Sequence, residues 1–187
     1  MRFTLARSLL LMRCRSFVMG STTIIHKGKG EVFDVFGPTI ALLTPPAATN
    51  NVYCVMHGVI PAGISVPLHS HPDDESFYII SGVVQALLSE GDNYKWIELK
   101  PGDFIHVPAN TRHAWKNISG AAVEGLITTT PRLGRFFLET GRRVEDGKTL
   151  LPPTPEQLQY FMQVADKYHH WLGDPEENAA VGISVLP

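Results

Sequence analysis

Residues 63–82 constrain the fold of this chain more than any other segment. They read G-I-S-V-P-L-H-S-H-P-D-D-E-S-F-Y-I-I-S-G and include His69, His71 and Glu75. Side chains alternate between the two faces of an extended strand, so residues of the same parity share a face. If the turn at residues 72–74 keeps the register, two imidazoles and a carboxylate point the same way. Together these groups suit a divalent transition metal. The segment therefore predicts two strands that present three candidate metal ligands.

A second segment supplies a fourth candidate ligand. Residues 102–117 read G-D-F-I-H-V-P-A-N-T-R-H-A-W-K-N, which predicts a short strand, a turn at residues 108–111 and a return strand that carries His113. Three histidines and one glutamate would leave one or two coordination positions open for water or substrate. An open position is typical of a reactive metal site rather than a closed structural one.

Both segments resemble the sequence motifs of the cupin superfamily. The first has that family's residues at its spacing, namely Gly63, His69, His71, Glu75 and Gly82. The second has Gly102, Pro108, His113 and Asn117. The one departure is Asn110, where the family usually has glycine. Because Asn tolerates a left-handed backbone better than other non-glycine residues, we expect the turn to survive.

The predicted cofactor is one divalent transition metal ion, held by His69, His71, Glu75 and His113. Fe, Mn, Ni, Co, Cu and Zn all accept such a donor set, so the residues do not identify the metal. Glu75 is also the candidate catalytic base, since a carboxylate bound through one oxygen keeps the other free to take a proton. A role for Glu75 as a ligand alone, and a degenerate cupin without metal, are the alternatives.

Five further residues are predicted to line the cavity and contact substrate, because each shares its parity, and so its strand face, with a candidate ligand or with another of the five on the same strand. They are Phe77, Ile79, Phe104, His106 and Trp115. A mainly apolar and aromatic wall favours a flat phenolic or enolic molecule over a charged sugar phosphate. His106 and Trp115 fit a packed structural role equally well.

Three short segments extend the resemblance to single-domain cupins that are similar to quercetin 2,3-dioxygenase: E-S-F-Y-I-I-S-G, G-D-F-x-x-V-P-x-N and R-F-F-L-E-T-G. This resemblance implies an oxidoreductase that cleaves a flavonol-like or other phenolic or enolic substrate with O₂. Two alternatives stay open. One is a non-oxidative decarboxylase, dehydratase or isomerase of a polyketide-like substrate in secondary metabolism, and the other is a non-catalytic ligand-binding cupin.

The rest of the chain up to residue 130 has the alternation of short apolar runs and turns that is typical of an all-β domain. Strand-like runs separated by Gly- and Pro-rich turns occupy residues 32–36, 39–44, 52–60, 83–88, 94–99 and 121–129. Many short strands at such spacing predict a sandwich or barrel. With the two motifs, the prediction for residues 21–130 becomes a small jelly-roll (cupin) β-barrel.

Residues 131–187 predict a C-terminal α-helical extension packed on the barrel. Thr154 and Pro155 form a helix start, and apolar residues then recur at helical spacing, which predicts a helix over residues 155–172. A shorter helix is predicted over residues 132–140, near the barrel mouth.

Residues 1–20 form a separate N-terminal extension that is rich in Arg and has no acidic residue. A mitochondrial transit peptide fits this segment, and so does an upstream start codon with Met19 as the true first residue. The two cysteines imply no disulfide framework and fit a reducing compartment such as the cytoplasm.

The overall charge gives no sign of an electrostatic partner. With 16 basic and 18 acidic residues, the chain is not expected to bind nucleic acid or an anionic membrane. The expected partners are a small aromatic or enolic substrate and O₂. An open jelly roll has edge strands that a second copy would cover, so a homodimer is predicted.

Overall fold

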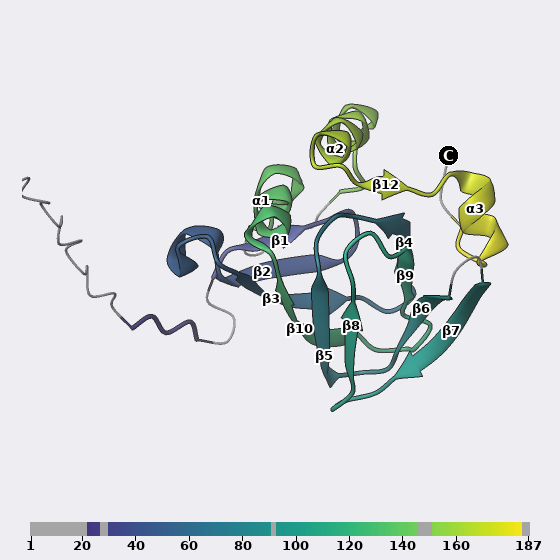
Figure 1. The fold of residues 1–187 in the computed structure, drawn as a ribbon, viewed down its shortest axis with the longest axis horizontal. Coiled ribbons are helices and arrows are strands. Elements are labelled where there is room, and N and C mark those ends of the chain that lie inside the picture. The colour runs from purple at the N-terminus through teal and green to yellow at the C-terminus, as the bar shows by residue number, and fades with distance from the viewer. Residues whose placement is uncertain (1–21, 27–29, 91–92, 146–150, 185–187) are drawn as a thin grey trace, which may run out of the picture.

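The computed structural model describes residues 22–26, 30–90, 93–145 and 151–184, which form two antiparallel sheets. The larger sheet has the order β11 (Arg142–Arg143), β1 (Val32–Asp34), β2 (Thr39–Thr44), β3 (Cys54–Ile60), β10 (Val123–Thr129), β5 (Glu75–Ser81) and β8 (Phe104–Val107). The smaller has the order β12 (Trp171–Leu172), β4 (Ser65–Ser70), β9 (His113–Lys116), β6 (Val84–Glu90) and β7 (Asn93–Leu99). Figure 1 shows the sheets facing each other, which confirms the jelly-roll prediction.

The predicted strands are all present. The strand β2 has the predicted bounds, and the ends of the others within the barrel differ by no more than two residues. The turn at Asn110 also forms as expected, with φ at 62° in the left-handed region. The motif residue Gly82 has φ at 78°, and a Cβ there would lie 2.7 Å from the carbonyl oxygen of Ala122. Both turns therefore depend on the residue types that the sequence supplies.

The barrel interior is filled by buried apolar side chains from both sheets. One cluster consists of Ile79, Val84, Ala86, Leu99, Trp115 and Val123. A second, between β2, β3 and β10, consists of Ile40, Cys54, Met56 and Ile127. Burial of this apolar surface holds the two sheets together, and the candidate ligands lie on strands that this core fixes in place.

Helices are concentrated after residue 130. They are α1 (Pro131–Thr140), α2 (Pro155–Lys167) and α3 (Pro175–Ala180), and one 3₁₀ turn, η1 (Pro46–Thr49), precedes β3. The prediction of a short helix at residues 132–140 is confirmed by α1. In Figure 1, α1 and α2 lie on one side of the barrel and α3 lies beside β4 and β7.

The second helix begins where predicted but is shorter. Thr154 caps it in a capping box with Gln157, but the helix ends at Lys167 rather than at residue 172. His169 adopts a left-handed backbone with φ at 61°, and the next residues extend along β4 as strand β12. Leu172 fits the helical spacing of apolar residues in the sequence, but it is not helical. Its backbone pairs with β4 instead.

The segment after residue 130 is therefore more than a packed extension. It adds the edge strand β11 to the larger sheet and β12 to the smaller one. Asn178 in α3 is fully buried (0% exposed); its side-chain oxygen accepts the N–H of Leu68 at 2.8 Å and its nitrogen donates to the carbonyl of Gly173 at 2.7 Å. This amide fastens α3 to β4, next to a candidate ligand.

The N-terminal extension of residues 1–20 lies outside the described residues, so both interpretations of it stay predictions. Within the ranges that the structure describes, no helix has the length and apolar character needed to cross a membrane.

We expect Asn178→Ala to lower the free energy of unfolding by about 1–3 kcal/mol, because the buried N–H of Leu68 would lose its acceptor. Chemical denaturation measures this change. Glu176→Ala, at an exposed position of the same helix, is the control and should stay within about 0.5 kcal/mol of the unaltered protein. Equal stability of the two variants would show that α3 is not fastened in this way.

Candidate metal centre

The four candidate ligands converge where the chain passes between the two sheets. His69 lies on β4, His71 directly after it, Glu75 at the start of β5 and His113 at the start of β9. The register of β4 and β9 places His69 opposite His113, and their ring centroids are 4.1 Å apart. Potential ligand atoms of the three histidines all lie within 4.8 Å of one another. Strand pairing thus brings together residues that are more than forty positions apart.

Glu75 lies against two of these imidazoles. Its Oε2 atom is 3.3 Å from Nε2 of His71 and 3.5 Å from Nε2 of His113. The residue is only 4% exposed, and His71 and His113 are buried as well, whereas His69 is partly exposed. Solvent therefore reaches the cluster on the side of His69.

Backbone hydrogen bonds fix the orientation of two rings. Nδ1 of His69 lies 2.8 Å from the carbonyl oxygen of Pro67, and Nδ1 of His113 lies 2.8 Å from that of Thr111. A carbonyl can only accept, so each Nδ1 carries a proton, and Nε2 is the ring atom left without a backbone partner. A ring held in this tautomer presents Nε2 as the metal-binding atom.

The protonation states of His69 and Glu75 suit a cation. Burial and then the neighbouring rings of His113 and His71 lower the pKa of His69 well below its ordinary value. Burial alone would raise the pKa of Glu75, but the close approach of the His113 and His71 rings outweighs this, so the pKa of the carboxyl lies below its usual range. Glu75 is therefore ionised at neutral pH. At His71, burial lowers the pKa, and Glu75 more than compensates, so that the net shift is upward.

These residues fit a divalent metal ion. Nε2 of His113 is buried and has no hydrogen-bond partner within the described part of the chain. A buried polar atom without a partner is costly, and a bound cation would remove that cost. The three-histidine cluster can hold a metal ion, and the adjacent carboxylate of Glu75 adds an oxygen donor of the kind that such ions accept.

Three of the predicted substrate residues lie inside the barrel. Ile79 and Trp115 are buried members of its apolar core. Phe77 is partly buried, and its ring centroid lies 4.5 Å from that of Trp115. Phe77 lies two residues after Glu75 and Trp115 lies two residues after His113, so both are close to the cluster along the chain. Contact with substrate stays a prediction for all three.

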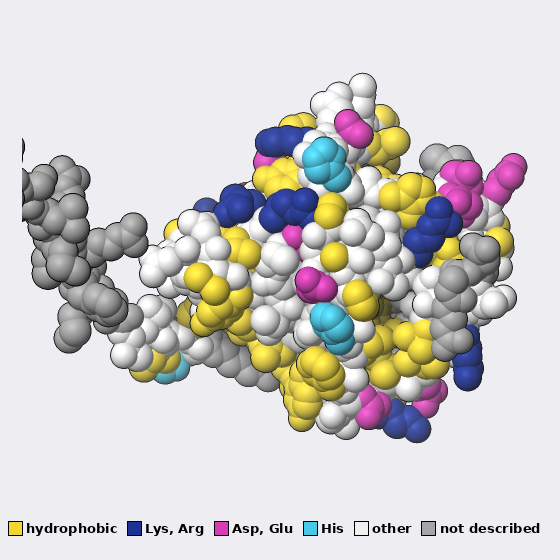
Figure 2. Space-filling model, viewed as in Figure 1, with side chains coloured by type: hydrophobic (Ala, Val, Ile, Leu, Met, Phe, Trp, Pro, Cys, Tyr) yellow, Lys and Arg dark blue, Asp and Glu magenta, His cyan; other side chains and the backbone are white. Residues whose placement is uncertain are grey.

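Phe104 and His106 were predicted to line the cavity, and that orientation is wrong, because both side chains lie on the outer surface. The register of β5 and β8 pairs Phe104 with Tyr78 and His106 with Ser76. Phe104 is 64% exposed, and Nδ1 of the exposed His106 lies 3.1 Å from Oγ of Ser76. Figure 2 shows exposed hydrophobic side chains gathered over these strands. Odd or even numbering on one strand does not show which residues of the next strand face inward. On β8 the inward-facing residues are Ile105 and Val107, which pair with Phe77 and Glu75.

Sequence reasoning missed His170, which contacts the cluster. Its ring centroid lies 5.2 Å from that of His71 and 4.1 Å from that of Phe136 on α1. Burial, and then the nearby His71, lowers the pKa of His170 to about 4, so the ring is neutral at neutral pH. No local signal indicated this position, because it results from the pairing of Trp171 with Ser70 across 101 positions of chain.

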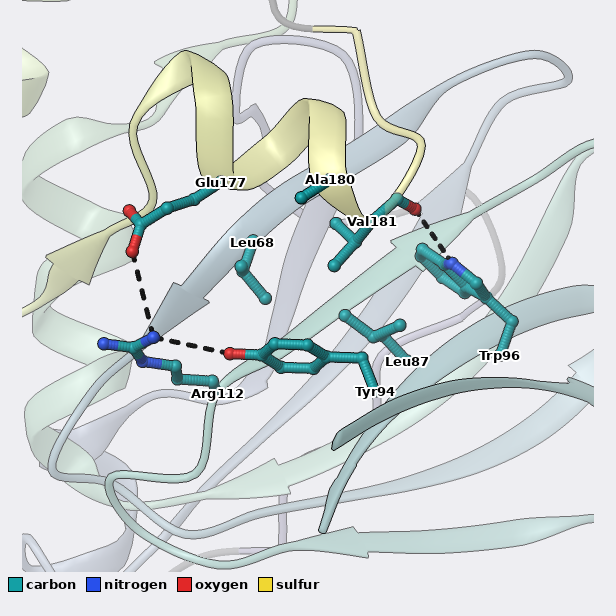
Figure 3. A pocket seen from close by; sticks show the side chains of 8 residues that line it. All are labelled: Leu68, Leu87, Tyr94, Trp96, Arg112, Glu177, Ala180 and Val181. Carbon is teal, nitrogen blue, oxygen red and sulfur yellow. Dashed lines mark hydrogen bonds and ion pairs between the residues drawn. The ribbon is translucent and has the colours of Figure 1, made fainter. Parts of the chain in front are cut away.

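A separate hollow of about 490 Å³ lies outside the barrel, between α3 and the smaller sheet (Figure 3). Leu68 and Leu87 lie between an end with Arg112 and Glu177 and an end with Trp96. None of the four candidate ligands lines this hollow. This hollow is therefore a different feature from the candidate metal centre.

Comparison with known proteins agrees with this geometry. Residues 56–128 match the family described as "Cupin domain". Quercetin 2,3-dioxygenase of Bacillus subtilis (strain 168) is 28% identical over 144 residues, which are 73% of this chain and 39% of that protein. Acireductone dioxygenase of Exiguobacterium sibiricum is 52% identical over 46 residues, which are 24% of this chain and 26% of that protein. The chain thus spans less than half the length of either relative.

Solved structures show the same fold. The polyketide cyclase RemF from Streptomyces resistomycificus matches with a TM-score of 0.55 and 16% identity, over 77% of this chain and 99% of that one. KdgF from Halomonas sp. matches with a TM-score of 0.50 and 17% identity, over 59% and 94%. The match to the cupin family covers residues 56–128, the larger part of the barrel, and the proteins similar to this chain include dioxygenases.

We expect His113→Ala to abolish the binding of one Co²⁺ per chain, because it removes a buried ligand that no other described residue replaces. The measurement is a Co²⁺ titration followed by visible absorption. His106→Ala is the control and should bind like the unaltered protein, since this histidine lies on the outer surface. Loss of binding in both variants would contradict the assignment.

Metal affinity should rise with pH. The pKa of His71 is raised in the metal-free protein, so a metal ion must displace its proton at any pH below that raised value. Affinity should fall as pH decreases from about 8 to 6, the range around the ordinary histidine pKa. Calorimetry in buffers of different ionisation enthalpy would count the released protons. A release of zero at pH 6 would contradict this reasoning.

Proposed function

We propose that this chain is a metal-dependent dioxygenase that acts on a flavonol-like or other phenolic or enolic small molecule with O₂. The observation that carries the proposal is the ionised carboxylate of Glu75, buried against the imidazoles of His71 and His113. The similarity to two proteins named dioxygenases supports it. His69, His71, His113 and Glu75 would hold the metal.

A metal ion in this position would act as a Lewis acid that lowers the pKa of a substrate hydroxyl. Glu75 then takes that proton with its carboxylate, which is ionised and excluded from solvent. The deprotonated substrate is electron-rich and reacts with O₂, and both oxygen atoms enter the product as the ring is cleaved. Fixed geometry lets the base act without reorganisation.

The body of the substrate would lie against Phe77, a partly buried residue at the margin of the packed interior. Phe77 faces inward two residues after Glu75, and beyond it lie Trp115 and Ile79 in the core. An aromatic and aliphatic wall accommodates a flat ring and excludes water, which keeps the deprotonated substrate from being reprotonated. The same wall offers no cation for a phosphate, so a sugar phosphate is a poor fit.

The same residues could also work without O₂. A buried carboxylate base next to three imidazoles equally suits a decarboxylation, dehydration or isomerisation of a polyketide-like enol, and this is the second candidate function. A non-catalytic ligand-binding cupin would need no ionised base in its interior, so Glu75 argues against it.

The test is O₂ consumption by metal-loaded protein with a panel of flavonols and other enols. We expect consumption that matches product formation, and we expect Glu75→Gln to lower kcat roughly 100- to 10,000-fold, as for other lost general bases. His57→Ala, on the far side of β10 from β5, is a control that should keep full activity. Product formed without O₂ would select the non-oxidative function, and no product with any compound would overturn the proposal.

A further inference from the structure

A buried ion pair joins the turn between His71 and Glu75 to α1. Asp73 is 2% exposed, and its carboxylate accepts hydrogen bonds from Nε and Nη2 of Arg132 at 3.1 and 2.9 Å. The hydroxyl of Thr130, the residue that caps α1, donates to the same carboxylate. A helix outside the barrel is therefore attached to the turn that carries two candidate ligands.

Other contacts hold the rest of this turn. The carboxylate of Asp74 accepts the N–H of Ala109 at 3.1 Å, and its carbonyl accepts the hydroxyl of Thr129 at 2.7 Å. The N–H of Asn110 donates to the carbonyl of His71 at 2.7 Å. The backbone of the turn is thus held by contacts that do not involve the carboxylate of Asp73.

The environment of His71 indicates a role for this carboxylate. The rings of His69 and His113 each donate through Nδ1 to the carbonyl two residues before them. Nδ1 of His71 is buried and has no hydrogen-bond partner in the described ranges, and Oδ2 of Asp73 lies 4.0 Å from it. Histidines that bind metal commonly donate their other N–H to a carboxylate or a carbonyl, which orients the ring and raises its basicity. At 4.0 Å the carboxylate of Asp73 lies just beyond hydrogen-bond distance of this N–H, and a small shift of the ring would bring the two together.

We propose that Asp73 is a positioning residue, which orients His71 for metal binding through its Nδ1–H, and that Arg132 on α1 holds the carboxylate in place. The inference rests on the metal centre of the proposed function. It also explains why a charge pair is buried here, since such pairs by themselves are weak contributors to stability and their best use is to define one geometry.

The chain contains a second ion pair of the same kind that can serve as a control. Asp34 on β1 is 4% exposed, and its Oδ2 accepts from Nε and Nη2 of Arg142 at 3.0 and 2.6 Å. β1 is separated from β5 by β2, β3 and β10. Loss of the Asp34 carboxylate breaks a buried ion pair without touching any candidate ligand.

The experiment compares Asp73→Asn with Asp34→Asn, with Co²⁺ as the probe. Both variants should lose stability in chemical denaturation. Only Asp73→Asn should weaken Co²⁺ binding, by roughly 10- to 100-fold, and shift the visible absorption bands that report the ligand geometry. Arg132→Gln provides a second variant at a partly exposed position, and Arg132→Lys should restore part of its lost affinity.

Equal Co²⁺ affinities and spectra for Asp73→Asn, Arg132→Gln and Asp34→Asn would overturn the inference while leaving the proposed dioxygenase untouched. Unaltered protein that binds Co²⁺ but consumes no O₂ would overturn the proposed function and leave Asp73 in its positioning role. Unaltered protein that binds no Co²⁺ would overturn both.

Discussion

A negative charge enclosed by protein is the constraint on which this structure depends. An ionised carboxylate costs several kcal/mol to bury, unless groups that favour its charge surround it. Nε2 atoms of His71 and His113 provide that environment for Glu75 at 3.3 and 3.5 Å. These residues come from different sheets, so the charge is tolerated only if the two sheets close around it. The jelly roll satisfies this requirement at the place where the chain passes from one sheet to the other.

Elements outside the barrel take part in the same arrangement. The strand β12 extends the smaller sheet beside β4 and sets His170 against His71. The helix α1 contributes Phe136, which packs on His170, and Arg132, which pairs with Asp73. The segment after residue 130 therefore determines the surroundings of the metal ligands, although it lies beyond the residues that match the cupin family.

In the proposed function, the chemistry begins with removal of a proton from a bound hydroxyl by Glu75. Glu75 would be the base, and the side chains beyond it are apolar. Such surroundings suit a flat neutral substrate and include no cation that would favour a charged one. Whether O₂ or an internal rearrangement completes the reaction depends on the metal and on the substrate. The polyketide cyclase RemF shares the fold, and a quercetin 2,3-dioxygenase is similar in sequence.

Much of the fold and the metal cluster could be predicted because the signals are local. The alternation of side chains, the glycines and Asn110 at the turns, and the spacing of His69, His71 and Glu75 all act within a few residues of one another. The face on which Phe104 and His106 lie could not be predicted, because it depends on the register with β5.

By itself, then, the sequence determined the strands, the turns and the identity of the four candidate ligands. Only the tertiary structure decided that the helix stops at Lys167, that His170 reaches His71 and that Arg132 holds Asp73. Each of these results from contacts between segments far apart in the chain. No local pattern encodes such contacts, because their energy is gained only when the two sheets have closed.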